Sequence, residues 1–487
     1  MLVRPKPIAN PEFYADFIWK RCGRGQSWPV EPTILPATSS MLLRLISIAT
    51  LGFLVITPIL FSIWLEYVPI HEFDPVAKDA FWGAGEPYKD DSRIEVFKVD
   101  FPDEQIDHIK LLLGKSHLVP PFEDCTLSIA RHSFMQNLSA VMASFDWKQH
   151  QHFLNTFKQY RTEIEGLLIH FLRISLPEEK GKDTIPILLL HGFPGSYWDF
   201  FKVIPILTNP VRFGFDFGVR KPFQFEVIVP SLPGFIFSSK PARKGITTTD
   251  IARIMAKLME RLSIARYFVH GSEFLGSEVA TSLASLYPEQ VRGIHLSNPM
   301  VHSKAFSWQV TMKTLLESFN KPQVGLFGRT GDFLDKTAVI LPNSDIVGDA
   351  LSTSPLGTAS YLMSVWSLFS TRDLSVQLNQ LFTLDELATV SYLYYLTETT
   401  PHALRIMNTV VHEDVFNQRR QVLVPSAILQ SPETPWHSSR SICQHRYLNI
   451  TRFTEATKGG VFQHLQDPNA VAADIFRFVE LVLMYKQ

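Results

Sequence analysis

Short apolar runs alternate with amphipathic segments in the middle of the chain. Each run is brief, apolar and bounded by Gly or Pro, and the four runs span residues 185–192, 225–234, 266–271 and 292–298. This pattern is typical of strands that are buried on both faces of a parallel sheet. Because helical patterns separate the runs, the sequence predicts a doubly wound α/β domain.

The clearest helical pattern lies between the second and third runs, over residues 247–264. Asp250 can cap its beginning. Apolar side chains then form one stripe at helical spacing, at Ile251, Ile254, Met255, Leu258, Met259 and Leu262. We therefore predict an amphipathic helix that buries this stripe.

The last third of the chain changes character twice. Residues 303–420 have helical and aromatic patterns, strand patterns return at 422–429 and 449–457, and an amphipathic helix over 470–484 closes the sequence. A helical insertion between late strands of a sheet often forms a lid over a pocket. We expect residues 303–420 to have that role.

An apolar stretch near the N-terminus carries no charge over 21 residues, from Leu45 to Leu65. About 20 apolar residues suffice to cross a bilayer as a helix. A signal peptide is the competing interpretation, but its apolar core is usually about 7–15 residues long. The sequence therefore predicts a transmembrane anchor at 45–65, after a flexible polar extension over 1–44. The side of the membrane on which the body lies stays open.

The composition excludes several classes of function. The 487 residues carry a net charge of -1, which gives no electrostatic footprint for nucleic acid. The three cysteines, Cys22, Cys125 and Cys443, are far apart and lack the spacing of a disulfide framework or a metal site. We predict neither a metal nor an organic cofactor. The 37 phenylalanines permit a large core and an apolar cavity.

The third apolar run leads into a turn that can present a nucleophile. In YFVHGSEFLGSEVA, residues 267–280, a strand pattern breaks at a Gly-Ser pair before a helical pattern begins. Such a strained turn needs small residues two positions before and after its central residue. The central residue is Glu273, where Gly271 meets this rule and Leu275 does not. We expect the leucine to distort the turn.

The first run ends in His191-Gly192-Phe193-Pro194. A His-Gly-x-Pro turn after a strand aims the amide of Phe193 into the site. With the amide of Phe274, directly after the nucleophile position, it can form an oxyanion hole. Together the two motifs predict an α/β-hydrolase fold.

On these motifs the chain resembles the microsomal-type epoxide hydrolases. The resemblance covers nearly everything after the apolar stretch and is carried by FWGAGEPYKDDSRIEVFKV, EIEGLLIHF, HGFPGSYWDF and KGGVFQHLQDPNAVAADIFRFV. It implies an N-terminal anchor, a meander domain over 77–183, an α/β-hydrolase core over 184–302 and 421–487, and a helical lid over 303–420. In that family an Asp attacks an epoxide carbon, two lid tyrosines bind the epoxide oxygen, and a His assisted by a carboxylate activates water. The product is a vicinal diol.

Most of the catalytic groups of that family are replaced here. The nucleophilic Asp corresponds to Glu273, whose extra methylene shifts the carboxylate by roughly an ångström and can cost about 100-fold in rate. The histidine of the family motif corresponds to Val461, which cannot accept a proton. The carboxylate that would orient the histidine maps to Glu433. His464 is a weak substitute for the base, because a structural role near a helix start is favoured for it.

Both lid tyrosine positions also lack a phenol. No tyrosine lies near residues 333–336, where the first position falls, or near Met407, where the second falls. The remaining lid tyrosines are expected to pack rather than to catalyse: Tyr361, Tyr392, Tyr394 and Tyr395.

Three hypotheses follow. The first is an enzyme with residual hydrolysis of apolar epoxides through Glu273. The second is a non-catalytic binder of an apolar small molecule or a protein partner, held at the endoplasmic reticulum membrane by residues 45–65. The third is a serine esterase that uses Ser272 or Ser277, for which the sequence suggests no base. We interpret the chain as a family member whose catalysis is impaired or lost, and we expect no histidine within hydrogen-bond reach of Glu273.

Overall fold

The computed structural model describes residues 77–177, 182–214, 222–301, 344–373, 375–411 and 421–484, together with single positions between 47 and 60. The chain divides into two compact units, one up to Phe61 and one from Ser62 onward. In the first unit the described positions are helical. Within the described residues no helix is both long and apolar enough to cross a bilayer. Most of the predicted span at 45–65 lies outside those residues.

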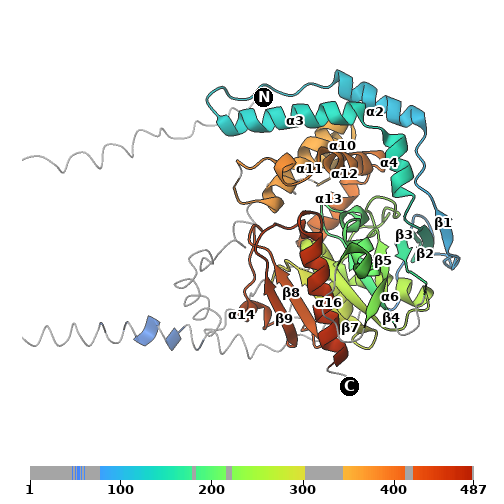
Figure 1. The fold of residues 1–487 in the computed structure, drawn as a ribbon, viewed down its shortest axis with the longest axis vertical. Coiled ribbons are helices and arrows are strands. Elements are labelled where there is room, and N and C mark those ends of the chain that lie inside the picture. Colours follow the sequence, from blue (N-terminus) through green and yellow to red (C-terminus); the bar gives the residue numbers. More distant parts are fainter. Residues whose placement is uncertain are drawn as a thin grey trace, which may run out of the picture. The chain divides into compact units, whose positions relative to one another are not determined.

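The second unit is built on a mixed nine-stranded sheet in the described part of the chain (Figure 1). Its first three neighbouring pairs are antiparallel and the remaining five are parallel. In spatial order the strands are β1 (Glu95–Phe97), β2 (Gln159–Ile164), β3 (Leu167–Ile174), β5 (Phe223–Pro230), β4 (Asp183–Leu190), β6 (Tyr267–Ser272), β7 (Val291–Ser297), β8 (Ser426–Gln430) and β9 (Ile450–Glu455). The predicted parallel strands are therefore confirmed.

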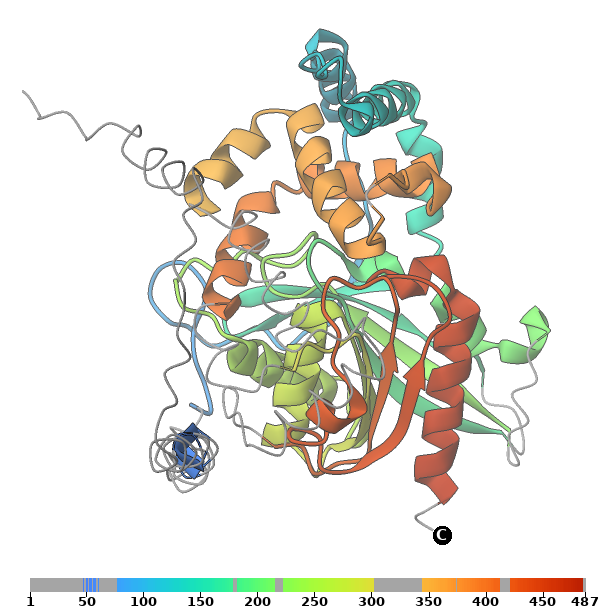
Figure 2. The same cartoon turned by 90° about the vertical axis from the view of Figure 1, so that its left-hand side faces the viewer.

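Helices cover both faces of this sheet (Figure 2). Gly271 of β6 abuts Ala280 of α7 (Glu273–Leu286), whereas the Phe268 ring contacts Phe478 of α16 (Pro468–Met484) at 5.9 Å. Odd and even residues of a strand point to opposite faces, so α7 and α16 lie on opposite sides. Helix α6 (Thr248–Arg261) contacts α7, and α5 (Val203–Thr208) contacts α16.

The predicted apolar stripe of α6 is confirmed, because each of its side chains is buried. The predicted cap is wrong by three residues. Thr247 is the N-cap, and its hydroxyl accepts a hydrogen bond from the backbone amide of Asp250. The Asp250 carboxylate in turn accepts from the backbone amide of Thr247 at 3.0 Å. The two residues form a capping box, which a Thr followed three positions later by an acidic residue makes possible.

The remaining helices form two packed groups. The N-terminal group contains α2 (Asp103–Lys115), α3 (Thr126–Ser144) and α4 (Trp147–Leu154). The second group contains α10 (Ser344–Ser352), α11 (Pro355–Ser370), α12 (Leu384–Leu396) and α13 (Thr400–Thr409). Helices α2 and α3 lie on α11 and α12 (Figure 1), where the Tyr392 hydroxyl donates to the Met142 carbonyl at 2.7 Å. The second group falls inside the region predicted to be a helical lid.

A buried ion pair joins the hairpin of β2 and β3 to α6. Glu165 lies in the hairpin turn with φ 55°, and its carboxylate accepts two hydrogen bonds from Arg253, at 2.7 and 2.8 Å. Both side chains are 2% exposed. Lys257 and the Trp82 indole also donate to this carboxylate, at 2.9 and 3.1 Å. The pair is satisfied by further hydrogen bonds, as a buried charge requires.

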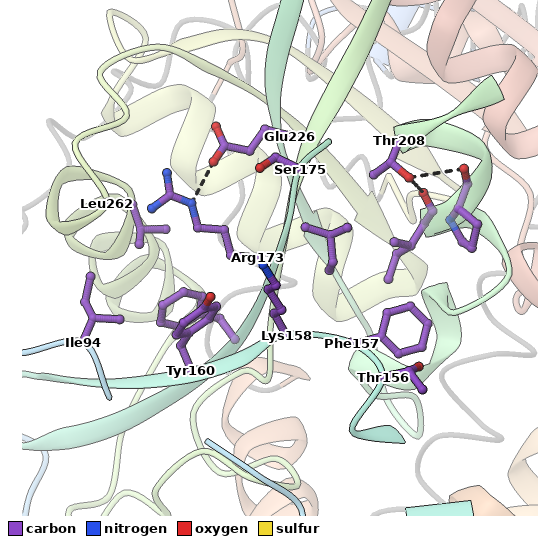
Figure 3. A pocket seen from close by; sticks show the side chains of 14 residues that line it. Ile94, Thr156, Phe157, Lys158, Tyr160, Arg173, Ser175, Thr208, Glu226 and Leu262 are labelled. Atoms are coloured by element: carbon purple, nitrogen blue, oxygen red, sulfur yellow. Dashed lines mark hydrogen bonds and ion pairs between the residues drawn. The ribbon is translucent and has the colours of Figure 1, made fainter. Parts of the chain in front are cut away.

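A cavity of about 580 Å³ lies at the edge of the sheet, between the β2–β3 hairpin and α5 (Figure 3). The ion pair of Arg173 and Glu226, 2.7 Å long, lies in its wall. None of its lining residues belongs to the turn around Glu273 or to the second helical group. We therefore place the candidate active site elsewhere, where the motifs meet.

Candidate active site

Glu273 stands at the turn between β6 and α7 with a positive φ of 62°. This backbone conformation is strained for a residue with a side chain, and it is typical of a nucleophile elbow. The expected distortion by Leu275 is not seen, because α7 begins directly at Glu273 and Leu275 is fully buried. The close approach to the neighbouring strand is made by Gly276, where a Cβ would lie 2.5 Å from the Leu190 carbonyl oxygen.

The Glu273 carboxylate lies against backbone amides. Its Oε2 accepts hydrogen bonds from the amides of Phe193, at 2.9 Å, and Leu275, at 3.0 Å, and the amide of Phe274 also bonds to this side chain. Its Oε1 is buried and has no hydrogen-bond partner among the described residues. The backbone amides thus hold Oε2, and Oε1 remains available to react. The predicted amides of Phe193 and Phe274 are both at this carboxylate, and the amide of Leu275 was not predicted.

The turn that holds this carboxylate depends on Gly192. A Cβ on Gly192 would lie 1.9 Å from Oε2 of Glu273. The other side of the turn is held by the second helical group, because Trp366 of α11 donates to the Pro194 carbonyl at 3.0 Å and Tyr394 of α12 donates to the Gly195 carbonyl at 2.7 Å. Helices α11 and α12 therefore fix the backbone that binds Glu273.

Burial sets the electrostatics of this site. It raises the pKa of Glu273 to about 7, although hydrogen bonds from the three backbone amides act in the opposite direction. Burial also raises the pKa of Asp199 to about 8, and the charge of Glu273 adds to that effect. Asp199 lies in the same motif and accepts from the Ser196 amide at 3.2 Å. Near neutral pH the elbow therefore holds Glu273 close to its titration midpoint beside a largely protonated Asp199.

Val461 and Glu433 occupy the positions that correspond to the histidine and the orienting carboxylate of the family motif. Val461 is fully buried, and its amide donates to the Phe369 carbonyl at 2.8 Å. Glu433 follows β8 and accepts from the Arg372 amide at 3.1 Å, so it orients backbone rather than a ring. In the described part of the chain no histidine nitrogen makes a hydrogen bond to Glu273.

His464 is buried and makes no hydrogen bond to Glu273. It lies in the short helix α15 (Gln463–Gln466), is 1% exposed and packs edge-on against Phe200 with ring centroids 4.8 Å apart. Its Nδ1 faces the Ser272 hydroxyl at 3.3 Å, and its Nε2 faces Nε2 of His270 at 2.6 Å. The sequence suggested no base for Ser272, whereas the structure places a histidine nitrogen within hydrogen-bond distance of its hydroxyl. Ser277 instead donates to the Gly271 carbonyl.

Three residues that were missed from the sequence continue this contact: His270, His295 and Asp474. Nδ1 of His270 lies 2.9 Å from Nδ1 of His295, and Nε2 of His295 lies 3.1 Å from Oδ2 of Asp474. His270 and His295 are register partners on neighbouring strands. A signal was available, because a histidine inside a buried strand needs a polar partner. We call the five residues Ser272, His464, His270, His295 and Asp474 the histidine network.

Two of the tyrosines in the second helical group bind backbone. The hydroxyls of Tyr392 and Tyr394 bind backbone carbonyls, as described above. Met407 is buried in α13, and residues 333–336 lie outside the described part of the chain. Among the described residues no group of three or more His, Cys, Asp or Glu side chains could hold a metal ion.

Comparisons with known proteins agree with this architecture. A profile of the epoxide hydrolase N terminus matches residues 94–200, and a profile of the alpha/beta hydrolase fold matches residues 185–398. The chain is 30% identical to Epoxide hydrolase 1 of Sus scrofa over 83% of its own length and 93% of that protein. It is also 30% identical to Epoxide hydrolase 1 of Oryctolagus cuniculus, over 91% of its own length and 99% of that protein.

The fold also matches a solved structure of such an enzyme. The juvenile hormone epoxide hydrolase of the silkworm Bombyx mori superposes with a TM-score of 0.77 at 25% identity, covering 85% of this chain and all of that one. With the elbow, the His-Gly-x-Pro turn and the sequence identity in agreement, the chain belongs to the microsomal-type epoxide hydrolase family.

Proposed function

We propose that this protein attacks an apolar epoxide through Glu273 and hydrolyses the resulting ester slowly. The proposal rests on the different surroundings of the two oxygens of the Glu273 carboxylate. Oε2 lies on the amides of Phe193 and Leu275, and Oε1 has no partner. A carboxylate held in this way can form a bond to carbon with one oxygen while the amides stabilise the other.

The second half of the family reaction lacks its usual base. An imidazole at the position of Val461 would take a proton from water, and general base catalysis typically contributes about 10²–10⁴-fold. A buried valine side chain supplies none of this. The ester on Glu273 is therefore expected to persist far longer than in a relative with the histidine.

The substrate class and location follow from the sequence and the relatives. Proteins named epoxide hydrolase and juvenile hormone epoxide hydrolase are similar to this chain over most of its length. We infer an apolar epoxide as substrate. We also infer that residues 45–65 anchor the protein in a membrane, that of the endoplasmic reticulum, because this apolar stretch is long enough to span a bilayer.

Mass spectrometry tests the proposal. The full-length protein is incubated with styrene oxide or stilbene oxide, quenched in acid and digested. The expected result is a peptide containing Glu273 that is heavier by the mass of the epoxide, with diol appearing slowly. The Glu273→Gln variant is the control and should carry no adduct. Rapid diol release over many turnovers would contradict the predicted impairment.

A second function has an observation in its favour. The hydroxyls of Tyr392 and Tyr394 are bound to backbone carbonyls, so neither is directed at an epoxide oxygen. If no phenol reaches the epoxide oxygen, the protein could bind an apolar ligand and leave it unchanged. Neither adduct nor diol, together with saturable binding of stilbene oxide by calorimetry, would favour this non-catalytic binder.

A further inference from the structure

The histidine network connects the elbow with α16 through four contacts between polar side-chain atoms. From Ser272 the contacts measure 3.3, 2.6, 2.9 and 3.1 Å, and they end at Asp474. All five residues are at most 4% exposed. Ser272 directly precedes Glu273 in the chain. A buried set of this length is costly unless every donor meets an acceptor.

The charge at the far end determines the direction of these hydrogen bonds. Burial alone would raise the pKa of Asp474, but hydrogen bonds and charges from His295, Arg452 and Thr454 lower it. An ionised carboxylate only accepts, so His295 donates from Nε2. Burial lowers the pKa of His464 to about 3 and also lowers the pKa of His270, so both rings are neutral.

Neutral imidazoles donate from one nitrogen and accept at the other. If His295 is neutral as well, which the ¹⁵N spectrum described below tests, this rule orders the whole network from Asp474. His295 accepts at Nδ1 from Nδ1–H of His270, His270 accepts at Nε2 from Nε2–H of His464, and His464 accepts at Nδ1 from the Ser272 hydroxyl. The proton of Ser272 is therefore directed away from the elbow, and the lone pairs of its oxygen stay available to accept another proton.

We propose that the histidine network is a proton relay that replaces the missing imidazole at Val461 and hydrolyses the ester on Glu273. This inference rests on the proposed function. Water attacks the ester carbon, and its proton passes to Ser272 Oγ as the Ser272 proton passes to His464 Nδ1. The protons on His464 Nε2 and His270 Nδ1 each move one contact further. His295 then carries a proton on both nitrogens and is paired with the Asp474 carboxylate.

The remaining steps need no reagent other than water and the relayed proton. The bond between the ester carbon and the substrate oxygen breaks, and the relayed proton returns through Ser272 to that oxygen. Glu273 is left as a carboxylic acid, and the proton it releases replaces the one that the epoxide oxygen took up during attack. Because His464 and His270 stay neutral throughout, only His295 changes its charge. A relay of four transfers is slower than direct contact with one imidazole.

The test compares the lifetime of the ester in matched variants. Ester is formed on the full-length protein with styrene oxide, excess epoxide is removed, and the Glu273 peptide is followed by mass spectrometry. Ser272→Ala removes the hydroxyl that accepts the proton from water. Ser231→Ala is the matched control, because the Ser231 hydroxyl also lies on Nδ1 of a buried histidine, His170, at 2.9 Å. Asp474→Asn weakens the far end without touching Ser272 or Glu273.

We expect ester decay to slow by roughly 100-fold in Ser272→Ala and in Asp474→Asn, the lower end of what a general base contributes. Ser231→Ala should decay like the unmodified protein. In the unmodified protein the decay rate should fall along a curve, not a line, as D₂O replaces H₂O, because several protons move together. A purely structural role would produce neither the effect from Asp474 nor this curvature.

Side-chain ¹⁵N NMR checks the network without any epoxide. His464 and His295 should carry their protons on Nε2 and His270 on Nδ1, and a different pattern would overturn the relay. If the ester lifetime is unchanged in Ser272→Ala and in Asp474→Asn, the relay is also refuted, whereas the proposed function still holds. An adduct on Ser272 instead of Glu273 would make Ser272 a nucleophile and refute the relay. If neither ester nor diol forms in any variant, the proposed function fails and the relay fails with it.

Discussion

Glu273→Gln is expected to stabilise the protein, and to do so more strongly as the pH rises. Burial raises the pKa of Glu273 from an ordinary value of 4.5 to about 7. The folded protein thus binds this proton more tightly than the unfolded chain does. The contribution of Glu273 to stability is complete below pH 4.5 and is lost as the pH rises through 7. Glutamine stays neutral, so it avoids this loss.

The magnitude follows from the difference between the two pKa values. At about 1.4 kcal/mol for each pKa unit, ionising Glu273 in the folded protein costs roughly 3 kcal/mol. The variant should therefore gain roughly 3 kcal/mol over the unmodified protein between pH 4.5 and 8. Asp199 acts in the same direction, because the charge of Glu273 contributes to its raised pKa and that contribution disappears in the variant.

Urea unfolding of both proteins at pH 5, 6, 7 and 8 measures the effect. The same substitution at an exposed glutamate, Glu289→Gln, is the control for loss of one carboxylate. The unpaired NH₂ of the glutamine can change the unfolding free energy of the variant by the same amount at every pH. The dependence of the difference on pH is therefore the decisive quantity. A difference in unfolding free energy that is the same at pH 5 and pH 8 would refute the assignment of a buried, titrating carboxyl at the elbow.

Three further predictions concern activity and packing. Ester formation should rise about tenfold from pH 6 to pH 8, because the attacking form of Glu273 is the carboxylate and its pKa is about 7; a flat profile by mass spectrometry would contradict this. Gly192→Ala should slow ester formation by at least about 100-fold, because the new Cβ would lie 1.9 Å from Oε2; an unchanged rate would show that Glu273 reacts from another position. Arg253→Met leaves the Glu165 carboxylate buried without its main partner and should cost about 3–5 kcal/mol in urea unfolding. Lys148→Met breaks an exposed pair and should change the unfolding free energy far less, and equal losses in the two variants would show that burial does not decide the cost.

The sequence was most informative where structure depends on near neighbours along the chain. The apolar runs predicted β4, β5, β6 and β7, since a strand buried on both faces must be apolar over its whole length. The stripe in α6 predicted its buried face for a similar reason. Motif spacing predicted that Phe193, Phe274 and Glu273 meet, because the carboxyl ends of adjacent parallel strands share one edge of the sheet.

Small-residue rules were less reliable, because they depend on what the backbone approaches. Leu275 breaks the sequence rule for the elbow, yet the helix there begins without distortion. The residue that must be small is Gly276, since it faces the end of β4. Likewise, the cap of α6 is Thr247 and not Asp250, because the hydroxyl and the carboxylate bond reciprocally across the first turn.

By itself the sequence determined the fold class, the family, the elbow residue and the loss of an imidazole at Val461, because each of these depends on which residue occupies a position in a local motif. Only the tertiary structure decided what surrounds those residues. His270 meets His464 across 194 positions of sequence, and Glu273 acquires its raised pKa by being enclosed. Hydrogen-bond partners and desolvation arise from the closure of distant segments around a site, and no local pattern carries that information.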